Sequence, residues 1–371
     1  MNKQFDNLFT FSWEDLHEAA INEGLIPVGY TCSYVPPVLL SAELLYPFRV
    51  NARNVNGTEI ADIYLSQVTC SYTRSILEYA MDDQLDFLQG WVFAAGCDHL
   101  RRLYDNLQYL LKPDFCHIID APHKSGSDAI AWYEKELRSL TKKLSEHFEI
   151  DINTSTIAKK IIEYNTLMKS LKQISDYRKL ESPPFTGTEF HKLMTAVWTL
   201  PVNTSQKIVN NIKEKLDKRS PPKGFRARVL VISSVIDQHE WIDCIEKVGA
   251  LVVADRFCTG SIPGIELYPE TDNPFNDIAS HLLKTNSCPR MMDTFENRIA
   301  LILKTIQTYH VDGVIIAPMK FCDIWGVETT QLMMSLKQKN IPFLRLEREY
   351  GVSGEGQLQT RVQAFLEQMK L

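Results

Sequence analysis

The residues with the greatest capacity for chemistry in this chain of 371 residues are its eight cysteines. No two of them have the C-x-x-C spacing that is typical of zinc ribbons and zinc fingers, so a structural zinc site is not favoured. Each cysteine is therefore either a small buried packing residue or a thiolate ligand of another kind. They are Cys32, Cys70, Cys97, Cys116, Cys244, Cys258, Cys288 and Cys322.

The positions of four cysteines favour a role as ligands. Cys32, Cys97 and Cys322 each follow a strand-like run, and Cys70 stands near the start of a helical pattern. Ligands of parallel α/β sheets bind outside the carboxyl ends of the strands, and helix N-termini stabilise thiolates and anionic clusters. Separated thiolates without zinc-type pairs fit an iron–sulfur cluster, whose cysteine ligands occur at varied spacing. The sequence thus predicts one metal site that is shared by these four thiols.

The other four cysteines carry weaker signals. Cys116 lies within a predicted strand and Cys244 in the middle of a predicted helix, so both are interpreted as packing residues. Cys258 and Cys288 lie in predicted loops, where either role is open.

The elements that must position these thiols form two alternating patterns. Short apolar runs alternate with helical patterns in each, which predicts parallel sheets covered by helices. In the first pattern the strands are expected at 26–31, 48–52, 90–96 and 115–122, and the helices at 36–45, 67–81 and 98–111. In the second the strands are expected at 228–236, 251–257, 312–321 and 341–347, and the helices at 240–249, 295–310, 328–340 and 354–369.

A segment rich in Lys, Glu, Ser and Leu at helical spacing separates the two patterns. We therefore expect an N-terminal α/β domain at 1–124, a helical insert and linker at 125–225, and a C-terminal α/β domain at 226–371. The predicted fold is α/β, with two Rossmann-like parallel-sheet domains and the cluster in the crevice between them.

Composition and charge exclude several classes of function. The 40 Lys and Arg residues against 46 Asp and Glu give a net charge of −6, which argues against nucleic acid as a partner. No apolar run approaches the roughly 18 residues of a membrane span, and the first 20 residues lack a signal-peptide core. We expect a cytoplasmic protein, in which structural disulfides are rare. Nucleotide-binding glycine motifs and the nucleophile elbow G-x-S-x-G are absent from the sequence.

Several ordered motifs resemble those of one known family, the iron–sulfur subunits of 2-hydroxyacyl-CoA dehydratases and benzoyl-CoA reductases. The resemblance covers nearly the whole chain and weakens only across the helical segment. The motifs are GYTCSYVPPVLL, VTCSYTRSILE, GCDHLRRLYDNL, DRFCTG, SCPR, DGVIIAPMKFCD and GEGQLQTRVQAFLE.

The resemblance implies a [4Fe-4S] cluster that is held by Cys70, Cys97 and Cys322. It further implies a separate ATP-hydrolysing activator, itself an iron–sulfur protein, that supplies a low-potential electron. The dehydratases of this family remove water from a 2-hydroxyacyl-CoA, and the reductases dearomatise benzoyl-CoA. The sequence does not distinguish these two reactions or identify the acyl-CoA.

One departure from the family pattern concerns Cys32. Many members carry a glutamate after the paired prolines, where this chain has Val38. A fourth thiolate from Cys32 would close the iron that a substrate-binding subunit keeps open. This favours a subunit that relays electrons to a larger, homologous, substrate-binding subunit in a heterodimer, so that acyl-CoA binds on the partner.

Two alternatives remain open. Some relatives are homodimers with a double-cubane [8Fe-9S] cluster that reduce small molecules, and eight cysteines can supply its six ligands if Cys258 or Cys288 is recruited. The remaining alternative is a scaffold subunit without catalytic function.

Overall fold

Two parallel sheets of four strands each form the framework of the molecule, confirming the predicted α/β fold. The computed structural model describes residues 8–11, 13–262, 265–351 and 354–369. The first sheet has the order β2-β1-β3-β4 and the second the order β6-β5-β7-β8, so both sheets follow the same connectivity. The strands are β1 (Ile26–Tyr30), β2 (Leu45–Arg49), β3 (Gly90–Ala94), β4 (Cys116–Ile119), β5 (Ala227–Ser233), β6 (Ala250–Arg256), β7 (Gly313–Ala317) and β8 (Phe343–Arg345).

In each sheet the first strand in sequence lies between the second and the third. The connections leaving β1 and β3, and those leaving β5 and β7, therefore diverge and open a crevice at the carboxyl ends of the strands. These central strands are apolar and almost completely buried, as is typical of parallel sheets that are covered on both faces.

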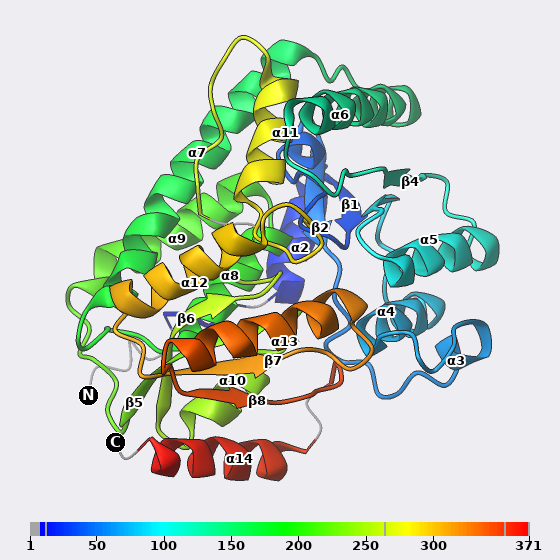
Figure 1. The fold of residues 1–371 in the computed structure, drawn as a ribbon. Coiled ribbons are helices and arrows are strands. Elements are labelled where there is room, and N and C mark those ends of the chain that lie inside the picture. The colour runs from blue at the N-terminus through cyan, green and yellow to red at the C-terminus, as the bar shows by residue number, and fades with distance from the viewer. Residues whose placement is uncertain (1–7, 12, 263–264, 352–353, 370–371) are drawn as a thin grey trace.

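The helices of the first α/β part cover its sheet, and α4 and α5 lie at the right of Figure 1. Helix α5 carries Leu100, Leu103 and Leu107 on one face, and this i, i+3, i+7 stripe is buried against the sheet. The elements are α2 (Trp13–Asn22), the 3₁₀ turn η1 (Leu39–Ser41), α3 (Ala61–Tyr64), α4 (Ser71–Met81) and α5 (Asp98–Leu110).

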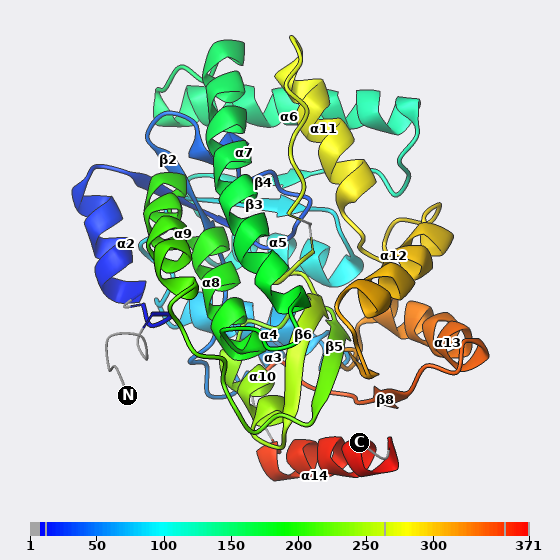
Figure 2. The same ribbon diagram turned by 90° about the vertical axis from the view of Figure 1, so that its left-hand side faces the viewer.

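The helices predicted between the two α/β parts are present, and they pack against both sheets. Helix α8 contacts β2 of the first sheet and β6 of the second, so it fixes the position of one sheet relative to the other. Figure 2 shows α7, α8 and α9 side by side along this junction. The elements are α6 (Ser127–Phe148), α7 (Thr154–Asp176), the 3₁₀ turn η2 (Tyr177–Lys179), α8 (Gly187–Thr199) and α9 (Val202–Leu216).

The second α/β part extends beyond its own sheet. Its helix α11 packs against α6 and α7, and one core cluster joins Val28 of β1, Leu167 of α7 and Leu282 of α11. The apolar core is therefore continuous from the first sheet through the middle helices to the second part. The helices of this part are α10 (His239–Glu246), α11 (Pro274–Thr285), α12 (Phe295–Thr308), α13 (Asp323–Gln338) and α14 (Glu355–Gln368).

Two sequence predictions about elements were wrong, and three helices were missed. The helix expected at 36–45 is only the 3₁₀ turn η1, where Ser41 Oγ donates a hydrogen bond to the Pro37 carbonyl and the chain then enters β2 directly. Strand β2 accordingly begins at Leu45 and ends at Arg49, earlier than the expected 48–52. Helices α2, α3 and α11 were not predicted.

Among the described helices, none combines the length and the apolar character needed to cross a membrane. Residues 1–7 and 12, which belong to the segment without a signal-peptide core, lie outside the described part of the chain.

Candidate functional site

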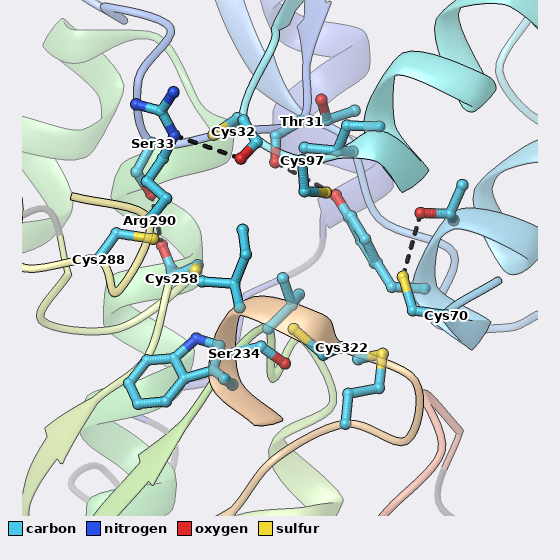
Figure 3. A pocket seen from close by; sticks show the side chains of 18 of the residues that line it. Thr31, Cys32, Ser33, Cys70, Cys97, Ser234, Cys258, Cys288, Arg290 and Cys322 are labelled. Carbon is cyan, nitrogen blue, oxygen red and sulfur yellow. Dashed lines mark hydrogen bonds between the residues drawn. The ribbon is translucent and has the colours of Figure 1, made fainter. Parts of the chain in front are cut away.

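Six of the eight cysteines line one cavity between the carboxyl ends of the two sheets (Figure 3). The cavity has about 90 Å³ of space for the centre of a water molecule, and its remaining lining is largely apolar. The six residues are Cys32, Cys70, Cys97, Cys258, Cys288 and Cys322. All four predicted ligands are therefore brought together, and the two cysteines whose role was open join them.

Three of these thiols stand at the start of a helix. Cys70, Cys97 and Cys322 are the N-cap residues of α4, α5 and α13. The backbone amides of Leu100 and Trp325, each three residues further on, favour the thiolate forms of Cys97 and Cys322. These positions suit anionic sulfur, because the positive end of the helix dipole and free N–H groups point towards it.

The remaining three thiols come from loops. Cys32 follows β1, Cys258 follows β6, and Cys288 lies between α11 and α12. Gly96 leaves room for the Cys32 side chain, because a Cβ atom at position 96 would lie 3.2 Å from Cys32 Sγ.

Cys32, Cys258 and Cys288 lie on one side of the cavity, and Cys70 and Cys322 lie on the other (Figure 3). Among the thiols, Cys70 interacts most strongly with Cys97 and with Cys322, and Cys288 interacts most strongly with Cys258. Cys32 also interacts with Cys288. Weaker interactions also link the two sides, between Cys97 and Cys32 and between Cys322 and Cys288. One group is thus Cys70, Cys97 and Cys322, and the other is Cys32, Cys258 and Cys288.

The thiols surround a volume and do not converge on one point. Within the described residues, no three His, Cys, Asp or Glu side chains could hold a single metal ion together. The spacing therefore suits a polynuclear group with several metal atoms better than a mononuclear zinc or iron site.

Burial keeps most of these sulfurs protonated when no cation is near. It raises the pKa of Cys322 to about 12 and that of Cys288 to about 11. The pKa of Cys97 and that of Cys258 are raised still further by burial, with a smaller contribution from the neighbouring thiols. Metal binding at this site must therefore displace the thiol protons.

Two buried arginines face the cavity without a carboxylate partner. Arg49 and Arg290 are each 4% exposed, and neither forms an ion pair within the described residues. Buried arginines elsewhere in the chain are paired, as in Arg178–Asp255 at 2.8 Å. An unpaired buried cation is costly, so these two side chains favour a negatively charged group in the cavity.

The other two cysteines lie elsewhere. Cys244 is buried in α10 on the far side of the second sheet, and Cys116 on β4 lines a separate surface cavity with His117. His99 accepts a hydrogen bond from the Cys70 backbone N–H through Nδ1 at 3.2 Å.

Sequence reasoning missed the two arginines and left Cys258 and Cys288 undecided. A signal was present for Cys258, because it follows its strand just as Cys32 follows β1. No comparable signal marked Cys288, which lies in the loop between α11 and α12, two residues before Arg290.

The sequence of this chain is similar to those of one family of known proteins. A family model described as 2-hydroxyglutaryl-CoA dehydratase, D-component, matches residues 32–369. YjiM of Escherichia coli (strain K12), named as a dehydratase subunit, is 23% identical over 93% of this chain and 92% of its own length. The β subunit of (R)-phenyllactyl-CoA dehydratase of Clostridium sporogenes is 20% identical, over 92% and 91%. A benzoyl-CoA reductase subunit from Thauera aromatica is 22% identical, over 93% and 91%.

Proposed function

Because this chain belongs to the 2-hydroxyglutaryl-CoA dehydratase D-component family, we propose that it is the iron–sulfur component of a low-potential enzyme. We further propose that its cluster is the double-cubane [8Fe-9S] type, held by six thiolates. The relatives named above are enzyme subunits, which supports an enzymatic role for this chain.

The observation that carries the proposal is that six thiols line one cavity, with Cys32, Cys258 and Cys288 on one side and Cys70 and Cys322 on the other, and that Cys97 interacts most strongly with Cys70. A double cubane consists of two [4Fe-4S] units that are bridged by sulfide, and each unit then needs three protein ligands. Cys70, Cys97 and Cys322 would hold one unit, and Cys32, Cys258 and Cys288 the other.

The charge of the cavity wall supports the same assignment. Thiolates and sulfides make such a cluster anionic, and the unpaired guanidinium groups of Arg49 and Arg290 provide the opposite charge. The apolar remainder of the wall, including Ile262 and Trp325, keeps water scarce and electrostatic interactions strong.

The cluster would supply low-potential electrons, received from an ATP-hydrolysing iron–sulfur activator and passed on to the substrate. An activator on another chain agrees with the absence of nucleotide-binding glycine motifs from this sequence. Double-cubane relatives reduce small molecules, so we propose a small molecule as the substrate. In this form the enzyme is a homodimer.

A second candidate is a [4Fe-4S] electron relay on Cys32, Cys70, Cys97 and Cys322. One observation favours it: Cys97 interacts electrostatically with all three of the other thiols. Two relatives are named as β subunits of acyl-CoA dehydratases, which suggests a larger partner subunit that binds acyl-CoA. The relay would then supply the electrons for either dehydration or ring reduction on that partner.

Iron content and two substitutions separate the candidates. Protein purified without oxygen should be brown and should hold about eight irons per chain as a double cubane, or about four as a relay cluster. Cys258→Ala and Cys288→Ala should each remove about half of the iron or more in the first case and leave it unchanged in the second. Cys244→Ala is the matched control, because that thiol is buried away from the cavity. Colourless protein with stoichiometric zinc would contradict both.

A further inference from the structure

We propose that Arg49 sets the reduction potential of the cluster by stabilising its reduced form, an inference that rests on the proposed iron–sulfur function. Arg49 is the last residue of β2 and reaches the cavity on the side of Cys32 and Cys258. Its role would be electrostatic, acting on the cluster without being one of its ligands.

The hydrogen bonds of Arg49 leave part of its guanidinium group available. Nη1 donates to Ser33 Oγ at 3.2 Å, whereas Nε is buried and has no hydrogen-bond partner. The guanidinium carbon lies 5.2 Å from the centroid of the Tyr30 ring. No carboxylate of the described residues forms an ion pair with Arg49, although the buried carboxyl of Asp237 interacts with it electrostatically from further away. The charge of Arg49 is therefore only partly offset and acts on whatever occupies the cavity.

The charge of Arg49 acts on the cysteines nearby. Arg49 and Cys258 both line the cavity. Ser33 links the two residues, because its Oγ accepts from Arg49 and donates to the Cys258 carbonyl at 3.2 Å. Arg49 therefore already favours negative charge on this side of the cavity.

Arg290 lies on the same side but is held differently. Its guanidinium group donates to four backbone carbonyls at the ends of β3 and β4, and its charge is partly offset by their dipoles. The four carbonyls are those of Ala95, Gly96, Ala121 and Pro122. We therefore assign Arg290 to holding the Cys288 loop in place, and the tuning of potential to Arg49.

The physical argument concerns the charge that is added on reduction. An electron makes the cluster one unit more negative, and a nearby cation in a dry, low-dielectric site stabilises this form more than the oxidised one. Removing the cation should make the potential more negative. An exposed cation has a much smaller effect, since water and salt screen it.

The test is a redox titration of the intact, cluster-loaded protein, followed by electron paramagnetic resonance. Arg49→Met should lower the ratio of reduced to oxidised cluster at a fixed potential by about tenfold, which is 59 mV for a one-electron couple. Arg49→Lys retains the charge and should recover most of this loss. The control is Lys320→Gln, which removes an exposed cation near Cys322 and should change the ratio by less than about twofold.

The iron content of the protein distinguishes a failure of the proposed iron–sulfur function from a failure of the inference about Arg49. If the unsubstituted protein binds no iron, the proposed function itself fails. If Arg49→Met keeps its iron and its midpoint potential, Arg49 has only a packing role and the inference is overturned. If Arg49→Met loses its cluster, the test becomes a comparison of Arg49→Lys with Arg49→Gln. The inference stands if the midpoint potential of Arg49→Lys is well above that of Arg49→Gln, and it is overturned if the two potentials are equal.

Discussion

At the scale of single residues, the thiols at helix N-termini provide the sharpest contrast with the cysteines elsewhere. Cys70→Ala, Cys97→Ala or Cys322→Ala should each remove most of the iron, because each takes away a proposed ligand that helix geometry has already placed at the cavity. The measurement is iron per chain after anaerobic purification.

Cys116 and Cys244 provide the matched comparison for these substitutions. Alanine at either position should leave the iron content intact and cost only packing, about 1–2 kcal/mol of unfolding free energy at most. Loss of iron from Cys116→Ala would contradict the argument that ligands lie at strand ends, because Cys116 is within β4.

How far the sequence predicts this site depends on the kind of signal each residue carries. Cys32, Cys97 and Cys322 could be found because the end of a parallel strand is visible as the end of an apolar run. Arg49 could not, because the sequence does not show that a charged residue ending a strand lacks an acidic partner. That information depends on packing between segments far apart in the chain.

At the scale of elements, α8 holds the two sheets together, and its N-terminus is secured by a capping box. The Thr186 hydroxyl accepts a hydrogen bond from the Glu189 backbone N–H, and the Glu189 carboxylate accepts one from the Thr186 backbone N–H. Gly187 brings this end close to β6, since a Cβ atom there would lie 2.4 Å from the Val252 carbonyl oxygen.

Loss of this cap should lower the free energy of unfolding by the contribution of one helix end. We expect Thr186→Ala to lower the free energy of unfolding by about 1 kcal/mol, within the usual range of 0.5–2 kcal/mol for such a cap. Urea denaturation measures the change. Thr166→Ala, at an exposed position inside α7, serves as the control and should change stability by no more than about 0.5 kcal/mol. Equal effects of the two substitutions would argue against the importance of the cap.

The elements themselves were predictable to different degrees for physical reasons. Buried parallel strands are continuous apolar runs, so all eight were identified, although β2 lies earlier in the chain than expected. The segment at 36–45 has helical spacing but begins with Pro36 and Pro37 and leads at once into β2, so the tertiary connection overrode the local preference. Helix α11 begins at Pro274 and packs against α6 and α7, contacts that local sequence does not reveal.

At the scale of the whole molecule, each group of three thiols draws on both α/β parts. Cys70 and Cys97 come from the first part and Cys322 from the second, whereas Cys32 comes from the first and the other two of its group from the second. A group bound by either set therefore connects two sheets that otherwise meet through α8 and the shared core.

Removing the proposed cluster should consequently destabilise the whole chain, not only its loops. A loss of 1 kcal/mol of stability lowers the melting temperature of a chain of this size by about 2–4 °C or less, and a bound metal group contributes several kcal/mol. We therefore expect chelation under anaerobic conditions to lower Tm by more than about 5 °C. The measurement is calorimetry before and after chelation, with Cys244→Ala as a control that should show the same shift. A Tm that does not change on loss of iron would mean that the two parts are held together without the cluster, by α8 and the continuous core alone.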